Sequence, residues 1–88
     1  MKTVCWNAEK AQKLKSTRGI DFNRIAVMIE EGELLGTIQV PSRTEQQMFL
    51  LDYDNYLVCV PFVESDHEIF LKTAYRNRKL NKTVKGTL

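Results

Sequence analysis

The residues with the clearest capacity for chemistry are cations near the end of the chain. From Lys72 to Leu88 the sequence holds six Lys or Arg residues and no Asp or Glu. If this stretch begins as a strand, Lys72 and Arg76 share one face, because side chains alternate along a strand. Their separation is then about 13 Å, which reaches across a couple of nucleotides but is too far for one phosphate. These cations are therefore candidates for contact with a polyanion.

An aromatic side chain stands among the same cations. Tyr75 precedes Arg76, and its ring could stack on a base, a contact worth about 1–3 kcal/mol in single-stranded binding. On the alternation of one continuous strand, Tyr75 shares a face with Leu71, and packing half-buried under a helix is the alternative. The sequence leaves both interpretations open.

The net charge of +2 conceals three blocks of charge. Residues 1–24 carry six basic and two acidic groups, residues 25–71 carry one basic and nine acidic groups, and residues 72–88 carry six basic groups alone. If the fold brings the two ends together, they form one basic face suited to a polyanion, whose binding is driven by counterion release. Two separate solvated patches are the alternative.

Two helices are predicted in the first third of the chain. Asn7 is a suitable N-cap for a helix over 8–17, and Gly19 suits its left-handed end. Asp21 is the next N-cap, for a helix over 22–31. That second helix carries the clearest helical period of the chain, with apolar side chains at i, i+3, i+4 and i+7: Phe22, Ile25, Ala26 and Ile29.

Strands are predicted over 3–6, 34–40, 47–53, 56–63 and 68–75. Asp54-Asn55 fits a two-residue hairpin turn, since both residues tolerate positive φ. Pro61 cannot donate to a ladder, so it belongs near a strand end, a bulge or an edge. The order of elements predicts a single α+β domain over residues 1–88: a short first strand, two helices packed on a three- to four-stranded antiparallel sheet, and a basic C-terminal tail.

Several classes of function find no support in the sequence. No apolar run approaches the ~18–20 residues that span a bilayer, and the N-terminus lacks the apolar core of an export signal, which indicates a cytoplasmic protein. One histidine and two dispersed cysteines cannot assemble a zinc site, so no metal or other cofactor is predicted. His67 follows Ser65 and Asp66 directly, and adjacent residues rarely converge as a triad, so His67 is interpreted as a solvated turn residue.

The order and spacing of four segments resemble the BrnT-like toxins of bacterial type II toxin–antitoxin systems over nearly the whole chain. They are Trp6-Asn-Ala-Glu-Lys10, Arg18-Gly-Ile-Asp-Phe22, Val60-Pro-Phe-Val-Glu-Ser-Asp-His-Glu-Ile-Phe-Leu-Lys-Thr73 and Arg78-Lys79. The resemblance implies a RelE-like fold and metal-independent RNA cleavage that inhibits translation. It also implies a cognate antitoxin as partner, which inhibits the toxin and binds operator DNA.

The residues that the resemblance carries over are Lys10, Arg18, Lys72, Arg78 and Lys79, and the chemistry of RNA cleavage suggests roles for these and the neighbouring cations. Arg76 and Arg78 are predicted to stabilise the charge of a pentavalent phosphorane, while Lys72 and Lys79 hold the flanking phosphates. Tyr75 or a lysine is the candidate for proton transfer. The remaining predicted RNA contacts are Lys10, Lys13, Arg18 and Lys82. Two other functions fit the same basic face, namely a non-catalytic RNA-binding module and a module that docks an antitoxin.

Overall fold

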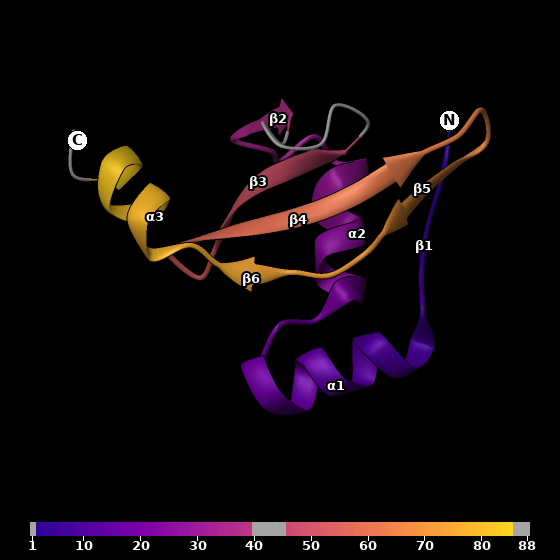
Figure 1. The fold of residues 1–88 in the computed structure, drawn as a ribbon, viewed down its shortest axis with the longest axis horizontal. Helices are drawn as coiled ribbons and strands as arrows, with labels where there is room; N and C mark the ends of the chain where they lie inside the picture. Colours follow the sequence, from indigo (N-terminus) through magenta and orange to yellow (C-terminus); the bar gives the residue numbers. More distant parts are fainter. Residues whose placement is uncertain (1, 40–45, 86–88) are drawn as a thin grey trace.

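The computed structural model describes residues 2–39 and 46–85, with side chains described up to residue 81. It has an α+β architecture, with three helices and a mixed sheet of six strands in the described part (Figure 1). In chain order the elements are β1 (Thr3–Trp6), α1 (Ala8–Arg18), α2 (Phe22–Glu30), β2 (Gly36–Gln39), β3 (Gln47–Tyr53), β4 (Tyr56–Glu64), β5 (Glu68–Leu71), β6 (Tyr75–Arg76) and α3 (Arg78–Lys85).

The sheet is larger than the sequence indicated. Its strand order is β1-β5-β4-β3-β2, with β6 also paired to β4. Strand β1 lies parallel to β5, whereas every other pair is antiparallel. The prediction of a three- to four-stranded antiparallel sheet was therefore wrong in strand count and in the place of β1. No local pattern reveals that pairing, because β5 lies more than sixty residues along the chain from β1.

Both predicted N-caps are confirmed. The backbone N–H of Lys10 donates to Asn7 Oδ1 at 3.0 Å, and the N–H of Asn23 donates to Asp21 Oδ1 at 2.9 Å. Gly19 ends α1 in the left-handed conformation, with φ of 67°. The observed helices agree with the predicted ones to within one residue at each end.

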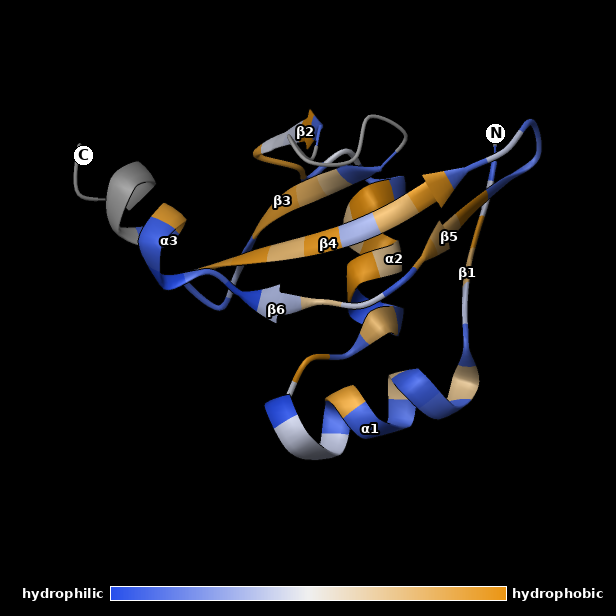
Figure 2. Ribbon diagram, in the orientation of Figure 1, coloured by the Kyte–Doolittle hydropathy of each residue, from blue (hydrophilic) through white to orange (hydrophobic). Residues whose placement is uncertain are grey.

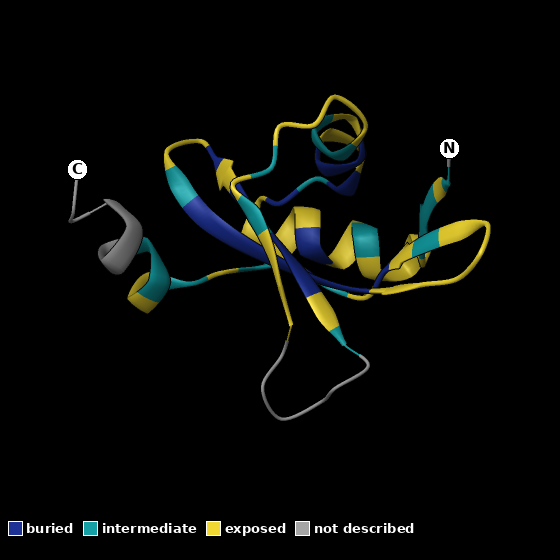
Figure 3. Cartoon of the chain, turned by 90° about the horizontal axis from the view of Figure 1, so that it is seen from above, coloured by how far each residue is buried: buried dark blue, intermediate teal, exposed yellow. Residues whose placement is uncertain are grey.

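Helix α2 covers one face of the sheet and anchors the core (Figure 1). Figure 2 shows α2 and the central strands as largely hydrophobic, and in Figure 3 the buried positions run along the middle of the sheet. The core cluster joins α1, the start of α2 and the helix-facing side chains of the sheet: Leu14, Ile20, Phe22, Ile25, Phe49, Leu51, Tyr53, Val58, Val60, Phe62, Leu71 and Ala74.

The hairpin between β3 and β4 turns as predicted. Asp54 and Asn55 have φ of 53° and 66°, the positive pair that a two-residue turn of this kind requires. The pairing runs from Tyr53 opposite Tyr56 to Gln47 opposite Phe62. This hairpin is the longest paired unit of the described sheet.

The predicted single strand over 68–75 is interrupted. Leu71 pairs with Phe62 and Tyr75 pairs with Cys59. Between these two pairs the chain advances four residues from β5 to β6 but only three residues along β4. One extra residue is therefore accommodated between β5 and β6, which makes a bulge. Because a one-residue shift moves side chains to the other face, Tyr75 does not share the face of Leu71. The predicted face assignment was wrong from the bulge onward.

Pro61 lies directly opposite this bulge, as one of its predicted positions required. Its carbonyl accepts a hydrogen bond from the N–H of Lys72 at 2.8 Å. Proline has no N–H to donate in return, so regular pairing ends there. Residues 72–74 consequently leave the ladder before β6 resumes it.

The predicted basic tail is instead helix α3. The side chain of Asn77 accepts from the N–H of Leu80 at 2.9 Å and thereby caps the helix. The N–H of Asn77 donates to the carbonyl of Leu57 at 3.0 Å, and Asn81 Oδ1 accepts from the N–H of Leu57 at 2.9 Å. These bonds fasten α3 to the start of β4. The charge pattern after Lys72 did not indicate these hydrogen bonds, because it drew attention to the cations and not to Asn77 and Asn81.

Candidate nucleic-acid interface

Two cavities adjoin along helix α1 and share the lysines at positions 10 and 13. The larger, of about 320 Å³, is lined by Asn7, Glu9, Lys10, Lys13 and Lys72. The smaller, of about 110 Å³, is lined by Lys10, Lys13, Leu14, Thr17, Arg18 and Thr73. We call the two together the α1 groove. It runs from the first to the last turn of α1, against the bulge between β5 and β6.

The parallel pairing of β1 with β5 creates the α1 groove. Trp6 pairs with Leu71, so both strands end at the same edge of the sheet. After β1 the chain continues into α1, and after β5 it continues into the bulge. Lys10 and Lys72, from opposite ends of the chain, thereby reach the same cavity. Lys10, Lys13 and Thr17 share one side of α1 because they follow a helical spacing.

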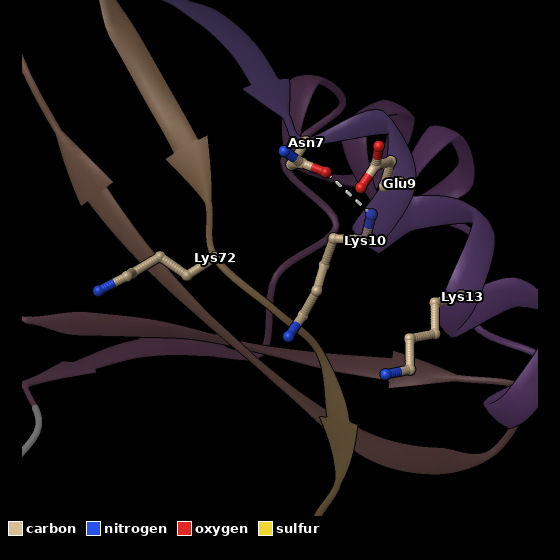
Figure 4. A pocket seen from close by; sticks show the side chains of 5 residues that line it. All are labelled: Asn7, Glu9, Lys10, Lys13 and Lys72. Carbon is tan, nitrogen blue, oxygen red and sulfur yellow. Dashed lines mark hydrogen bonds between the residues drawn. The ribbon is translucent and has the colours of Figure 1, made fainter.

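The amino groups of the α1 groove are open to a ligand. Lys10, Lys13 and Lys72 are all exposed, and none forms an ion pair with a described residue. Figure 4 shows the amino group of Lys10 extending between Lys13 and Lys72, while the carboxylate of Glu9 stays beside the N-terminus of α1. The structure thus brings together three of the predicted contacts as one cationic site.

Two arginines connect α1 to the last strand. Arg18 Nη1 donates to the carbonyl of Ala74 at 3.0 Å, and Arg76 Nη1 donates to the carbonyl of Arg18 at 2.6 Å. We call this pair of bonds the arginine clamp. A guanidinium has five N–H donors, so each arginine retains others for a ligand. The clamp holds the C-terminal end of α1 beside the bulge and so fixes that end of the groove.

The other predicted site residues lie away from the α1 groove. Tyr75 donates its hydroxyl to Met48 Sδ at 3.3 Å, on the sheet face opposite the core. Burial, with the neighbouring Cys59, raises the pKa of Tyr75. Arg78 and Lys79 begin α3, which lies past the far end of β6 (Figure 1). The backbone of Lys82 is in α3, and its side chain lies outside the described residues.

His67 is an exposed turn residue, as predicted. It lies in the connection between β4 and β5, where its carbonyl accepts from the N–H of Thr3 at 3.0 Å. The length of β5 separates it from Lys72 by about 16 Å, at ~3.3 Å per residue. Its imidazole is therefore remote from the α1 groove.

Sequence reasoning missed the polar groups between the lysines. Asn7 was interpreted only as a cap, and no role in binding was predicted for Glu9, Thr17 or Thr73. The helical spacing of Lys10, Lys13 and Thr17 carried a usable signal. Strand alternation from Leu71 was a second usable signal, since it places Thr73 on the helix-facing side of the sheet, and Thr73 lines the smaller cavity.

No group of three or more His, Cys, Asp or Glu residues that could hold a metal ion occurs within residues 2–39 and 46–85. Over the same residues, no helix is both long and apolar enough to cross a membrane. Comparison of the chain with protein-family models, curated proteins and solved structures found no match.

Proposed function

We propose that the chain binds RNA along the α1 groove and cleaves it without a metal, as a toxin of the BrnT-like kind with a RelE-like fold. One observation supports the binding: Lys10, Lys13 and Lys72 line one cavity although they come from opposite ends of the sequence. The cleavage and the toxin role rest on the sequence resemblance.

A nucleic-acid strand suits the α1 groove in charge and in length. Helix α1 has 11 residues and is therefore about 16 Å long, at ~1.5 Å per residue. That length accommodates a few nucleotides of an extended strand, with successive phosphates near successive lysines. Each phosphate that a lysine neutralises releases a condensed counterion, which favours binding at low salt.

The chemistry proposed for the groove is electrostatic. In RNA the 2′-OH attacks the adjacent phosphorus as its proton leaves, and the bond from phosphorus to the 5′-oxygen breaks as that oxygen gains a proton. The products are a 2′,3′-cyclic phosphate and a 5′-hydroxyl. In this proposal Lys72, which lines the larger cavity, and Arg18, which lines the smaller one, stabilise the negative charge of the intermediate.

A cognate antitoxin is the partner in this proposal. The resemblance implies one that binds operator DNA and forms a hetero-oligomer with the toxin. An antitoxin segment covering Lys10, Lys13 and Lys72 would block RNA from the α1 groove. The antitoxin would then compete with RNA for the same cations.

Cleavage of RNA in the presence and absence of EDTA tests the enzymatic part. We expect cutting that EDTA leaves intact, that Lys72→Ala reduces at least tenfold, and that Lys15→Ala leaves unchanged. Lys15 is a matched control, because it lies on α1 but lines neither cavity. Abolition by EDTA, or equal rates in the two variants, would contradict the proposal.

A second candidate function is RNA binding without cleavage. The observation in its favour is that, among the described lining residues, Glu9 is the only carboxylate and no imidazole or phenol is present. General acid–base catalysis, typically worth 10²- to 10⁴-fold, would then depend on a lysine or on Glu9. This candidate predicts salt-sensitive binding with no change in RNA length.

A further inference from the structure

The smaller end of the α1 groove combines cations with hydroxyl groups. Its cavity of about 110 Å³ is lined by three cationic residues, two threonines and one leucine: Lys10, Lys13, Arg18, Thr17, Thr73 and Leu14. That volume corresponds to about four water molecules at ~30 Å³ each, enough for a sugar- or phosphate-sized group. This end of the groove therefore offers hydrogen-bonding groups as well as charge.

The two threonines are not equivalent. The hydroxyl of Thr17 donates to the carbonyl of Lys13 at 2.6 Å, so its proton is committed within α1. Thr73 is half-buried as a residue, lines this cavity, and its hydroxyl makes no hydrogen bond with a described residue. A hydroxyl both donates and accepts, and it matches another hydroxyl in the same way. Thr73 is thus the uncommitted group at this end.

Aromatic stacking does not contribute to the groove. No aromatic residue lines either cavity in the part of the chain that the structure describes. Trp6, the nearest aromatic before α1, packs against Phe22 with ring centroids 5.8 Å apart. A strand lying in the groove would therefore be contacted along its sugars and phosphates, with its bases directed elsewhere.

From this geometry we infer that the α1 groove reads the sugar–phosphate backbone and that Thr73 distinguishes RNA from DNA. Its hydroxyl hydrogen-bonds the 2′-OH of a nucleotide whose phosphate lies on Lys10, Lys13 or Arg18. The 2′-OH is the group by which a protein recognises RNA at a given position. This inference rests on the proposed RNA binding and adds the residue responsible for the choice of nucleic acid.

The test measures the affinity of the full chain for RNA and DNA oligonucleotides of one sequence by fluorescence anisotropy. Readings are taken before any detectable cleavage of the RNA, which a denaturing gel checks. We expect RNA to bind about threefold to tenfold more tightly than DNA, the effect of one hydrogen bond. Thr73→Val keeps the shape of the side chain and should lower RNA affinity to that of DNA, while DNA affinity is unchanged. Thr73→Ser should restore the preference.

A matched control is the substitution Thr37→Val, because Thr37 is an exposed threonine on β2, at the opposite edge of the sheet. It should keep the RNA preference of the wild type. Equal RNA and DNA affinities in the wild type, or an unchanged preference in Thr73→Val, would overturn the role of Thr73 and leave RNA binding intact. If the wild type binds neither oligonucleotide, the proposed function fails and this inference with it.

Discussion

Helices α1 and α2 follow one another in the chain and contribute in opposite ways. Helix α2 buries Phe22, Ile25 and Ala26 against the sheet, whereas α1 buries Leu14 alone. In Figure 2, α1 is mostly hydrophilic and α2 mostly hydrophobic. Of the two helices, α2 therefore contributes more to the core, and α1 carries the cations of the proposed site.

The two helices are also held differently. Helix α2 is held by its apolar face. Helix α1 is held by fewer contacts: Leu14 and Ala11 pack on the core, and Arg18 at its C-terminal end donates to the carbonyl of Ala74. This thin apolar stripe leaves the rest of the helix surface free for cations. The predictions below test this division between a structural helix and a binding helix.

The largest effect is expected for the core contact of α2. Ile25 is completely buried, and Ile25→Ala should lower the free energy of unfolding by about 2–5 kcal/mol, through lost burial and the cavity that remains. Val27→Ala is the control on the same helix, since Val27 is 51% exposed. Urea denaturation measures both. Similar losses in the two variants would show that α2 does not anchor the core through this face.

A smaller effect is expected for the arginine clamp. Arg18→Met removes the hydrogen bond to Ala74 and should cost about 1 kcal/mol. Lys15→Met on the same helix removes only an exposed ion pair with Asp21 at 3.8 Å, and should change stability by less than about 0.5 kcal/mol. Equal values in urea denaturation would mean that the clamp does not hold the end of α1.

The caps of the two helices should respond differently to acid. Hydrogen bonds from the N–H of Asn23 lower the pKa of Asp21, the cap of α2, whereas Asn7 does not titrate. Because the pKa of Asp21 is lower in the folded state, its carboxylate stabilises the fold at pH values above the unfolded-state pKa of ~3.9. This stabilisation is lost as the pH falls through the folded-state pKa. Asp21→Asn keeps a capping side chain.

Unfolding free energies of the wild type and Asp21→Asn, measured from pH 6 to pH 2, test this difference. We expect similar stability near pH 6 and a shallower decline with acid in the variant. A lowered pKa of Asp54, caused by its hydrogen bonds and ion pair with Arg24, contributes in the same direction in both proteins. Parallel curves would contradict a role for the charge of Asp21.

The sequence predicted what depends on local contacts. Both caps, the left-handed Gly19, the Asp54-Asn55 turn and the position of Pro61 follow from the backbone preferences of single residues. The pairing of β1 with β5 and the bulge before β6 depend on residues far apart in the chain, so no local sequence pattern predicted them. The same limit separates the site residues. Lys10 and Lys13 followed from charge and helical spacing, whereas the face on which Tyr75 lies required the register of β6.

The smallest effect on stability is expected for the lysines of the α1 groove. Lys10 and Lys72 are exposed, and replacing either with Ala should change the unfolding free energy by no more than about 0.5 kcal/mol. Affinity for RNA should fall in both variants. The same substitution at Lys15 should alter neither quantity appreciably. Destabilisation by Lys10→Ala as large as that by Ile25→Ala would end the division between the two helices.

The most direct test of the central claim is the salt dependence of RNA binding. Affinity for a single-stranded RNA is measured from low to high salt for the wild type, Lys10→Ala, Lys72→Ala and the control Lys15→Ala. Each lost phosphate contact should reduce the slope of log affinity against log salt by about 0.7. We predict shallower slopes for Lys10→Ala and Lys72→Ala and the wild-type slope for Lys15→Ala. Identical slopes in all four proteins would contradict a nucleic-acid site in the α1 groove.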